Sequence, residues 1–557
     1  MFDKVIGIHP TASLRTWRGL LSCLSELFAV KFVEWPHQDS VRLNAGIVLP
    51  GGTVHHGLAQ RAGVPRLLVF SGDAGVQEGR QRTVRFADSS SVHTALRGQL
   101  LSEEKAPSGH SLAAVEGDEI LATVEGKPVW LRRRHDHGTL DFVAAVPPGL
   151  GDGERGYDYY RRGRFMGMLP LLSFLQDVTR EVAWELPPLR ACLMFDDPNL
   201  HWLSYGFVDY RELARHAAQH NYHVAFATIP LDGWRVHPRT AELFRQHKDR
   251  LSLLVHGNNH THRELGRAGD EADMLPLVAQ ALRRIEGIER KAAVEIARVM
   301  APPHGACSAA SGSALRRLGF EAVCVSRGSL QRSNPDASWP RTFGLGLVEN
   351  LGGGLPVIAR FGLSADFSAD IILRAFLQQP IIPIGHHNDL ADGLELMAEL
   401  AGKINRLGGV AWADMKTIAR SNFLTRKEGN VQAIRLHSRV ACVPTAPDVT
   451  ELRIECPALQ EGQEELFVVR QNGEQVAPCE ASGRCLMFQV QSAEVLQARV
   501  VCRERLEPAR LRVPSTRLWP VARRLLKEAV DRVQPCLGTP RRPAAIGRSL
   551  GRQPVGA

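Results

Sequence analysis

The chain has 557 residues, of which 44% are hydrophobic and 23% charged, so it is globular and too long for a single hydrophobic core. Its 68 basic and 59 acidic residues give a net charge of +9, but they form no long basic helix, which argues against a nucleic-acid partner. No apolar stretch is long enough to cross a bilayer and the N-terminus lacks a secretory pattern, so we expect a cytoplasmic protein without a membrane span.

Residues 1–150 are predicted to form an α/β domain. A helical periodicity over 14–30 alternates with short apolar runs that predict a doubly wound parallel sheet. Those runs are 5–8, 31–34, 45–49 and 66–70. Over 117–146, short runs broken by glycine turns predict hairpins that extend this domain.

The turn Leu49-Pro50-Gly51-Gly52 at a strand end resembles the class I glutamine amidotransferase fold in outline. That activity needs a cysteine at a strand-to-helix elbow, and Cys23 falls inside the first predicted helix instead. A binding or assembly role is therefore the better expectation for this domain.

Residues 151–189 are predicted to be a linker and a connecting helix over 163–184. The main domain, 190–427, repeats short apolar runs between helical stretches such as 208–220 and 275–285. The runs are 191–195, 223–229, 251–255, 298–301, 322–325, 356–359, 380–384 and 410–412. Six to eight such units predict a distorted (β/α) barrel.

Period-two alternation over 428–515 predicts a small antiparallel β-sandwich. The last part, 516–557, is predicted to contain an amphipathic helix over 519–533 and a disordered tail over 538–557, which is rich in Pro, Gly and Arg.

Polar residues follow four of the predicted barrel strands. Asp196 and Asp197 end the first run, and Pro198 stops it because proline cannot donate to a strand ladder. The other three strand ends carry His256-Gly-Asn-Asn-His260, Pro302-Pro303-His304-Gly305 and Gly385-His386-His387-Asn388-Asp389. A barrel gathers its strand ends on one face, where such enzymes carry out their chemistry.

An aspartate with two histidines spaced i, i+4 makes a three-ligand set that leaves positions open for water and substrate. Zinc suits mixed nitrogen and oxygen ligands, although other divalent transition metals do too. A second carboxylate can take a proton from the acidified water. A histidine on the other side of the barrel opening can give a proton to the leaving group. The pattern therefore indicates metal-assisted hydrolysis of an amide or ester.

Together these stretches resemble the ordered motifs of the polysaccharide deacetylases of the NodB-homology, carbohydrate esterase type. The resemblance covers about residues 190–425. It implies that Asp196 is the general base, that Asp197, His256 and His260 bind the metal, and that His387, with His386 as the second choice, is the general acid. The implied reaction removes an acetyl group from a sugar.

The chain departs from the family pattern in three places. The first motif continues Asp-Asp-Pro rather than Asp-Asp-Gly, and Gly257 stands where Ser or Thr is usual. The third motif lacks the arginine that orients the base, for which Arg327 and Arg360 are substitutes. Substrate contacts are expected from Pro303, His304, Gly305, Trp202 and Arg327.

Two functions follow as hypotheses. The first is a metal-dependent hydrolase, most simply a zinc enzyme, that uses an activated water to remove an acetyl group from an amino sugar in a polysaccharide or glycolipid precursor. The second is a catalytically reduced relative that binds glycan or scaffolds polysaccharide-biosynthesis proteins.

Overall fold

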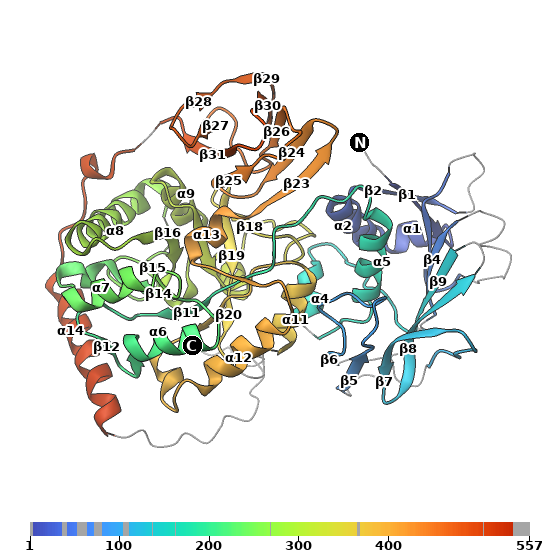
Figure 1. Cartoon of the computed structure of the whole chain (residues 1–557), viewed down its shortest axis with the longest axis horizontal. Coiled ribbons are helices and arrows are strands. Elements are labelled where there is room, and N and C mark those ends of the chain that lie inside the picture. Colours follow the sequence, from blue (N-terminus) through green and yellow to red (C-terminus); the bar gives the residue numbers. More distant parts are fainter. Residues whose placement is uncertain are drawn as a thin grey trace.

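The structure is a computed structural model with three parts, which Figure 1 shows side by side. An α/β domain lies at one end, a larger α/β domain at the other, and an all-β domain packs on the larger one. The structure describes residues 4–35, 42–52, 64–71, 81–103, 111–135, 138–161, 163–267, 269–364, 368–504 and 506–537. The tail predicted over 538–557 lies outside the described residues.

The N-terminal domain is built on a nine-stranded sheet with the order β2-β1-β3-β4-β9-β8-β7-β5-β6. The pairs from β2 to β9 are parallel and those from β9 to β6 are antiparallel, so the parallel sheet continues into the predicted hairpins. Its strands are β1 Lys4–His9, β2 Val30–Glu34, β3 Ala45–Val48, β4 Arg66–Phe70, β5 Arg82–Phe86, β6 Leu100–Glu103, β7 Glu119–Val124, β8 Lys127–His135 and β9 Gly138–Val143.

Two predicted helices of this part differ in length from the structure. The helix predicted over 14–30 is broken at Trp17 into α1 (Ser13–Thr16) and α2 (Arg18–Phe28). The helix predicted over 163–184 is only α5 (Leu169–Thr179), because Pro170 at its start suits the first helical turn, where the missing N–H has no partner to lose. A short helix, α4 (Gly156–Arg161), precedes it. α5 packs against α2 and β4, within the core of the N-terminal domain.

The larger domain contains a second nine-stranded sheet, with the order β18-β19-β17-β16-β15-β14-β11-β21-β20. All pairs are parallel except β18–β19. The strands are β11 Leu193–Asp196, β14 Val224–Thr228, β15 Leu251–His256, β16 Ile296–Ala301, β17 Ala322–Val325, β18 Glu349–Leu351, β19 Leu355–Ala359, β20 Phe361–Gly362 and β21 Pro383–Gly385.

This sheet is curled rather than flat. β19 and β20 lie near opposite ends of the strand order, yet only Arg360 separates them in the chain. The backbone N–H of Arg360 donates to Val325 of β17, and that of Phe361 donates to Ile382. One peptide segment therefore brings the two ends of the sheet together, as expected for a distorted barrel.

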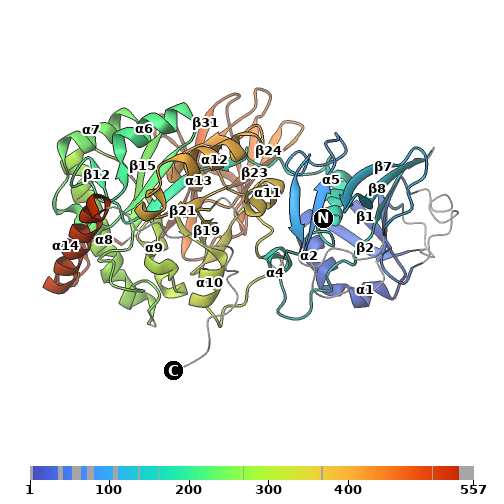
Figure 2. The ribbon, with the colours of Figure 1, turned by 90° about the horizontal axis from the view of Figure 1, so that it is seen from below.

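Helices cover this sheet on the outside (Figures 1 and 2). α6 begins later than predicted because the Asp209 side chain accepts hydrogen bonds from the N–H groups of Arg211 and Glu212. α8 is longer than predicted and begins at a capping box of Asp270 and Asp273. The helices are α6 Tyr210–Gln219, α7 Pro238–Gln246, α8 Glu271–Ala292, α9 Ala309–Arg317, α10 Arg327–Ser333, α11 Ser368–Phe376, α12 Glu395–Asn405 and α13 Met415–Arg420. Short pairs are β10 Arg190–Ala191 with β22 Ala411–Trp412, and β12 Ser204–Tyr205 with β13 Val208–Asp209.

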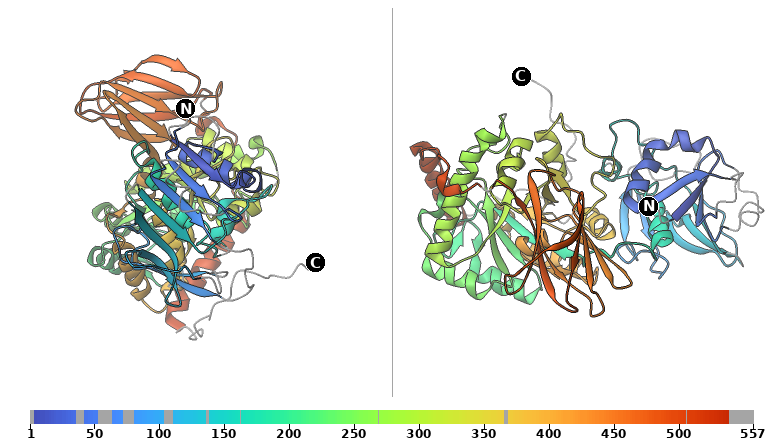
Figure 3. Two further views of the ribbon diagram at one scale, coloured as in Figure 1. Left: turned by 90° about the vertical axis from the view of Figure 1, so that its right-hand side faces the viewer. Right: turned by 90° about the horizontal axis from the view of Figure 1, so that it is seen from above.

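The all-β domain is a sandwich of a five-stranded and a four-stranded sheet, which Figure 3 shows beside the larger domain. Its strands are β23 Phe423–Glu428, β24 Val431–Leu436, β25 Val440–Pro444, β26 Glu451–Glu455, β27 Glu464–Arg470, β28 Gln475–Val476, β29 Pro478–Ser482, β30 Cys485–Gln489 and β31 Val495–Cys502. The prediction of a purely antiparallel sandwich was wrong at one pair. β24 and β26 run parallel, because the chain crosses to the other sheet as β25 before it returns.

After the sandwich the chain returns to the larger domain as α14 (Leu518–Val533), which packs beside β12 (Figures 1 and 2). The residues that α14 buries are Pro520, Arg524, Glu528 and Asp531, so its buried face is largely charged. Among the described residues, no helix combines the length and apolar character that a membrane crossing requires.

Candidate metal centre

Asp196 and Asp197 lie at the carboxyl end of β11, in the interior of the curled sheet. The apolar run before them is fully buried, as expected for a strand covered on both faces. Asp197 has a φ of 83°, a region that non-glycine residues rarely adopt. Pro198 follows it and disfavours helical geometry at Asp197. Strained backbone of this kind is concentrated at functional sites.

Three side chains converge beside β11. Asp197 Oδ1 lies 3.2 Å from His260 Nε2 and 3.6 Å from His256 Nε2. One donor atom from each residue falls within 4.8 Å of the others, so the three could hold one metal ion. Asp197 Oδ1 is buried and has no hydrogen-bond partner in the described structure, as a metal-ligand oxygen would without its ion. The donor set fits a divalent transition metal.

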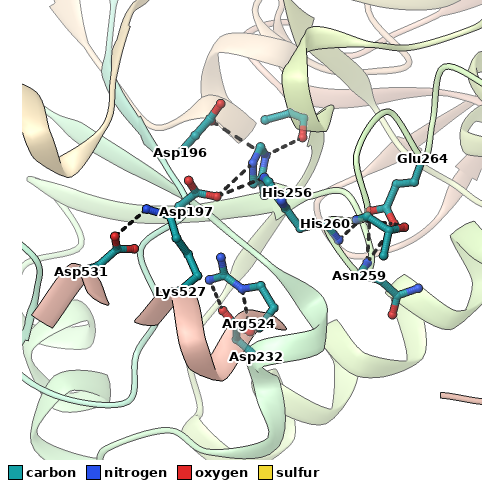
Figure 4. Close-up of polar contacts among 12 residues, drawn as sticks. Asp196, Asp197, Asp232, His256, Asn259, His260, Glu264, Arg524, Lys527 and Asp531 are labelled. Carbon is teal, nitrogen blue, oxygen red and sulfur yellow. Dashed lines mark hydrogen bonds and ion pairs between the residues drawn. The ribbon is translucent and has the colours of Figure 1, made fainter. Parts of the chain in front are cut away.

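A hydrogen bond fixes the orientation and the tautomer of the His256 ring, as metal binding through Nε2 would require. Its Nδ1 lies 2.9 Å from the carbonyl oxygen of Ala301 (Figure 4). Nδ1–H therefore donates to that oxygen, which leaves the Nε2 lone pair directed toward Asp197. Burial lowers the pKa of His256, but the charges of Asp196 and Asp197 outweigh it and raise the pKa.

His260 is kept neutral, as a ligand must be. Burial and the charge of His256 lower the pKa of His260 to about 3. Arg523 contacts the backbone carbonyl of His260, and its Nη2 lies 3.2 Å from His260 Nδ1. Ligation through Nε2 places the His260 proton on Nδ1, so Arg523 then keeps only the carbonyl as its acceptor.

Glu264 organises the loop between the two histidines, and the sequence pattern did not single it out. Its carboxylate is fully buried and accepts from the backbone N–H groups of the four residues 258–261, of which Figure 4 labels Asn259 and His260. Gly257 has a φ of 61°, and a Cβ there would lie 2.4 Å from Glu264 Oε1 and 2.5 Å from Pro303 Cγ. The departure to glycine thus lets the loop close on Glu264.

Asp196 does not join the three candidate ligands, and its carboxylate contacts a cation instead. Arg360 Nη1 lies 3.0 Å from Asp196 Oδ1, and both side chains are buried. Of the two arginines considered from sequence, the structure places Arg360 beside Asp196. Arg327 instead pairs with Glu349 at 3.2 Å and donates to Gln379 at 3.0 Å.

Of the two late histidines, His387 is buried and His386 is exposed. The His387 ring lies between Tyr205 and Phe207, and Gly206 leaves it room, because a Cβ there would lie 2.2 Å from the ring. His387 Nε2 lies 3.2 Å from Asp531 Oδ1. The backbone N–H of His386 donates to Asp389 Oδ2.

The partner of His387 comes from α14, which the sequence did not connect to the site. Figure 4 shows Arg524, Lys527 and Asp531 of this helix on the side of Asp197. Tyr205 donates to Asp531 at 2.7 Å, and Arg524 pairs with Asp232 at 2.6 Å. The charge of Arg524 also helps His256 and His260 to lower the pKa of Asp197 against the effect of burial.

The other predicted substrate residues differ in their surroundings. Pro303 is buried against Gly257, and the exposed His304 ring lies 5.4 Å from that of His260. Gly305 has a φ of 67° and leaves room for Ser329. Trp202 is 45% exposed, with the guanidinium of Arg235 4.3 Å from its ring centroid. Arg327 is held by Glu349 and Gln379, as described above.

A scan against protein-family models finds no match, and no curated protein matches the chain. Solved structures do match part of it. One, from Mycobacterium smegmatis and assigned to the polysaccharide deacetylases, has a TM-score of 0.31 and 15% identity over 43% of this chain and 92% of its own. A family 4 carbohydrate esterase from Streptomyces lividans has a TM-score of 0.25 and 15% identity over 41% and 94%. A CE4 esterase from Streptococcus mutans has a TM-score of 0.24 and 14% identity over 41% and 85%.

Proposed function

We propose that the chain is a metal-dependent hydrolase that removes an acetyl group from an amino sugar of a glycan or glycan precursor. The observation that carries the proposal is the separation of two adjacent carboxylates. Asp197 faces two histidines with an oxygen that has no hydrogen-bond partner, while Asp196 faces a buried arginine. Paired carboxylates in different environments are suited to different tasks.

Asp197, His256 and His260 would hold the ion. A divalent ion there, for which zinc is suited, would acidify a bound water and polarise the acyl oxygen. Asp196 takes a proton from the attacking water, and the hydrogen bond from Arg360 orients its carboxylate. His387, positioned by Asp531, gives a proton to the leaving nitrogen. The bond from the water oxygen to the acyl carbon forms, the C–N bond breaks, and acetate and an amine are released.

The test combines metal analysis with acetate release from a panel of acetylated sugars and oligosaccharides. The parent should hold about one divalent ion per chain. Asp197→Ala should lose both metal and acetate release, whereas Asp196→Asn should keep the metal and lose acetate release. Equal metal content in the parent and Asp197→Ala would refute the metal site, and an active Asp196→Asn would remove Asp196 as the base.

One observation favours a second function, that of a glycan-binding relative without catalysis. α14 crosses the site, and the His387 side chain is only 3% exposed. A parent protein that binds metal and acetylated glycans, but releases no acetate from any member of the panel, would favour this function.

A further inference from the structure

A cavity of about 640 Å³ lies between α8, α14 and the short helix η1 (Pro230–Trp234). It is separate from the three metal-ligand side chains, none of which lines it. Its size is within the range of small-molecule sites. One of these elements also contacts the candidate metal site, because Arg284 of α8 donates to the side chains of Asn258 and Asn259 in the loop between His256 and His260.

The lining of the cavity is strongly cationic. It includes Arg283, Arg284, Arg290 and Lys291 of α8 and Arg524 of α14. Its two acids, Asp232 and Glu528, are engaged by Arg524, by His201 and by Arg532.

The four cations of α8 are not neutralised in this way. Arg283 donates to the carbonyl oxygens of Pro508 and Leu511, and Arg284 donates only to amide, hydroxyl and carbonyl oxygens. Within the described part of the chain, no carboxylate lies within ion-pair distance of Arg290 or Lys291. The cavity therefore has an excess of positive charge that an anion would balance.

Gly287 lies at the centre of these four cations. They occupy the positions i−4, i−3, i+3 and i+4 from it, which share its face of the helix. Glycine is unfavourable in a helix interior, yet a Cβ at Gly287 would meet no atom within 4 Å. Packing thus gives no reason for the glycine. Its effect is to keep space open between the two pairs of cations.

The opposite wall is apolar. Trp234 of η1 is 57% exposed, and Val521 and Leu525 of α14 lie beside it. Guanidinium groups match phosphate oxygens by forked hydrogen bonds, and an indole face suits a ring or an alkyl chain. The cavity combines open space at Gly287, four cations and an apolar wall. From these features we infer that it binds a small molecule that carries a diphosphate joined to a ring or lipid.

Two kinds of ligand share this chemistry, a nucleoside-diphosphate sugar and a prenyl-diphosphate-linked sugar. The inference goes beyond the proposed hydrolase activity and does not depend on it. A ligand held here would lie next to the loop of His256 and His260, because Arg284 bridges the two.

The test is calorimetric titration of the full chain, after metal removal, with inorganic pyrophosphate, a uridine diphosphate sugar and farnesyl diphosphate. All three should bind, and the tighter of the two organic ligands identifies the source of the diphosphate. Gly287→Gln fills the open space between the two pairs of cations, and Arg290→Gln/Lys291→Gln removes two exposed cations. Each should weaken binding by about tenfold or more, Gly287→Gln because its side chain occupies the ligand's space and Arg290→Gln/Lys291→Gln because charge-assisted hydrogen bonds are lost.

Matched variants separate this site from other effects. Arg211→Gln/Arg215→Gln removes two exposed cations of α6 and should leave the affinity unchanged, as should Asp197→Ala, which disables the metal site. Absence of binding by all three ligands would overturn the inference. Equal affinity of the parent, Gly287→Gln and Arg290→Gln/Lys291→Gln would also overturn it, and so would loss of binding in Asp197→Ala alone.

Discussion

Arg360 Nη1 lies 3.0 Å from Asp196 Oδ1, across the interior of the curled sheet. Arg360 is the residue between β19 and β20, where the two ends of the sheet meet. The closure of the sheet and the environment of the proposed base therefore depend on the same residue. The arginine that the structure places beside Asp196 thus lies between two strands and not in the third motif.

Arg360→Gln should destabilise the protein and abolish most acetate release while leaving the metal content intact. Removing one partner of a buried ion pair costs about 3–5 kcal/mol, because the other charge stays buried without compensation. Urea unfolding and metal analysis check this. The double variant Asp196→Asn/Arg360→Gln should recover part of the lost stability. Additive losses would show that the two side chains are not coupled.

Asp531→Asn should lower acetate release by about tenfold or more, because proton transfer by a positioned side chain contributes about 10²–10⁴-fold. Metal content should not change, since Asp531 contacts His387 and Tyr205 rather than a metal ligand. Asp531 also contacts Lys527 and Tyr205. Tyr205→Phe removes the second of these contacts and is the matched control, with a smaller expected loss. A normal rate in Asp531→Asn would leave α14 with a structural role only.

Glu264→Ala should reduce metal affinity by about 10- to 100-fold, the usual effect of losing an outer partner of the ligands. Its carboxylate accepts the N–H groups of the loop that carries His260, and without it those groups are buried without partners. Competition with a metal-sensitive dye measures the affinity. Glu289→Gln is the control, because Glu289 pairs with Arg298 on the outside of the barrel. Equal affinities in both variants would contradict this account.

The attachment of α14 should weaken at low pH. Burial would raise the pKa of Glu528, but hydrogen bonds from His201 and Arg532 outweigh it and lower the pKa to about 2. A lowered folded-state pKa means that this stabilisation is present above the ordinary value of 4.5 and is lost as pH falls toward 2. Hydrogen exchange of α14 amides, corrected for intrinsic rates, should show reduced protection across this window. Glu528→Gln should lose protection already at neutral pH, whereas Glu242→Gln on α7 should not.

Gly287→Ala should stabilise the protein by about 0.5–1 kcal/mol, because alanine is the better helix former and its Cβ meets open space. Gly312→Ala in α9 should do the opposite, since a Cβ there would lie 2.8 Å from Leu351 Cγ. Urea unfolding checks both. A destabilised Gly287→Ala would show that the glycine is required by the fold and not by the open cavity.

The sequence singled out Asp197, His256 and His260, which the structure brings together as a candidate metal-ligand set, although the choice of Asp197 over Asp196 came from the family resemblance. This was possible because His256 and His260 follow one buried strand and Asp197 follows another, and the carboxyl ends of parallel strands meet on one face. Local pattern also predicted the strands 66–70 and 322–325 with the bounds observed. It placed helix ends less well, because caps such as Asp209 and proline positions such as Pro170 decide them.

Only the tertiary structure decided which groups act on those residues. Sequence proposed two arginines near Asp196 and could not choose, since the choice depends on where the sheet closes. Asp531 lies beyond an entire β-sandwich, and Glu264, Asp531 and Gly287 carry no motif. Periodicity and motif spacing report on neighbours within a strand or helix, whereas these contacts join segments that are distant in the chain. They form only when the whole fold has placed α8 and α14 against the open end of the barrel.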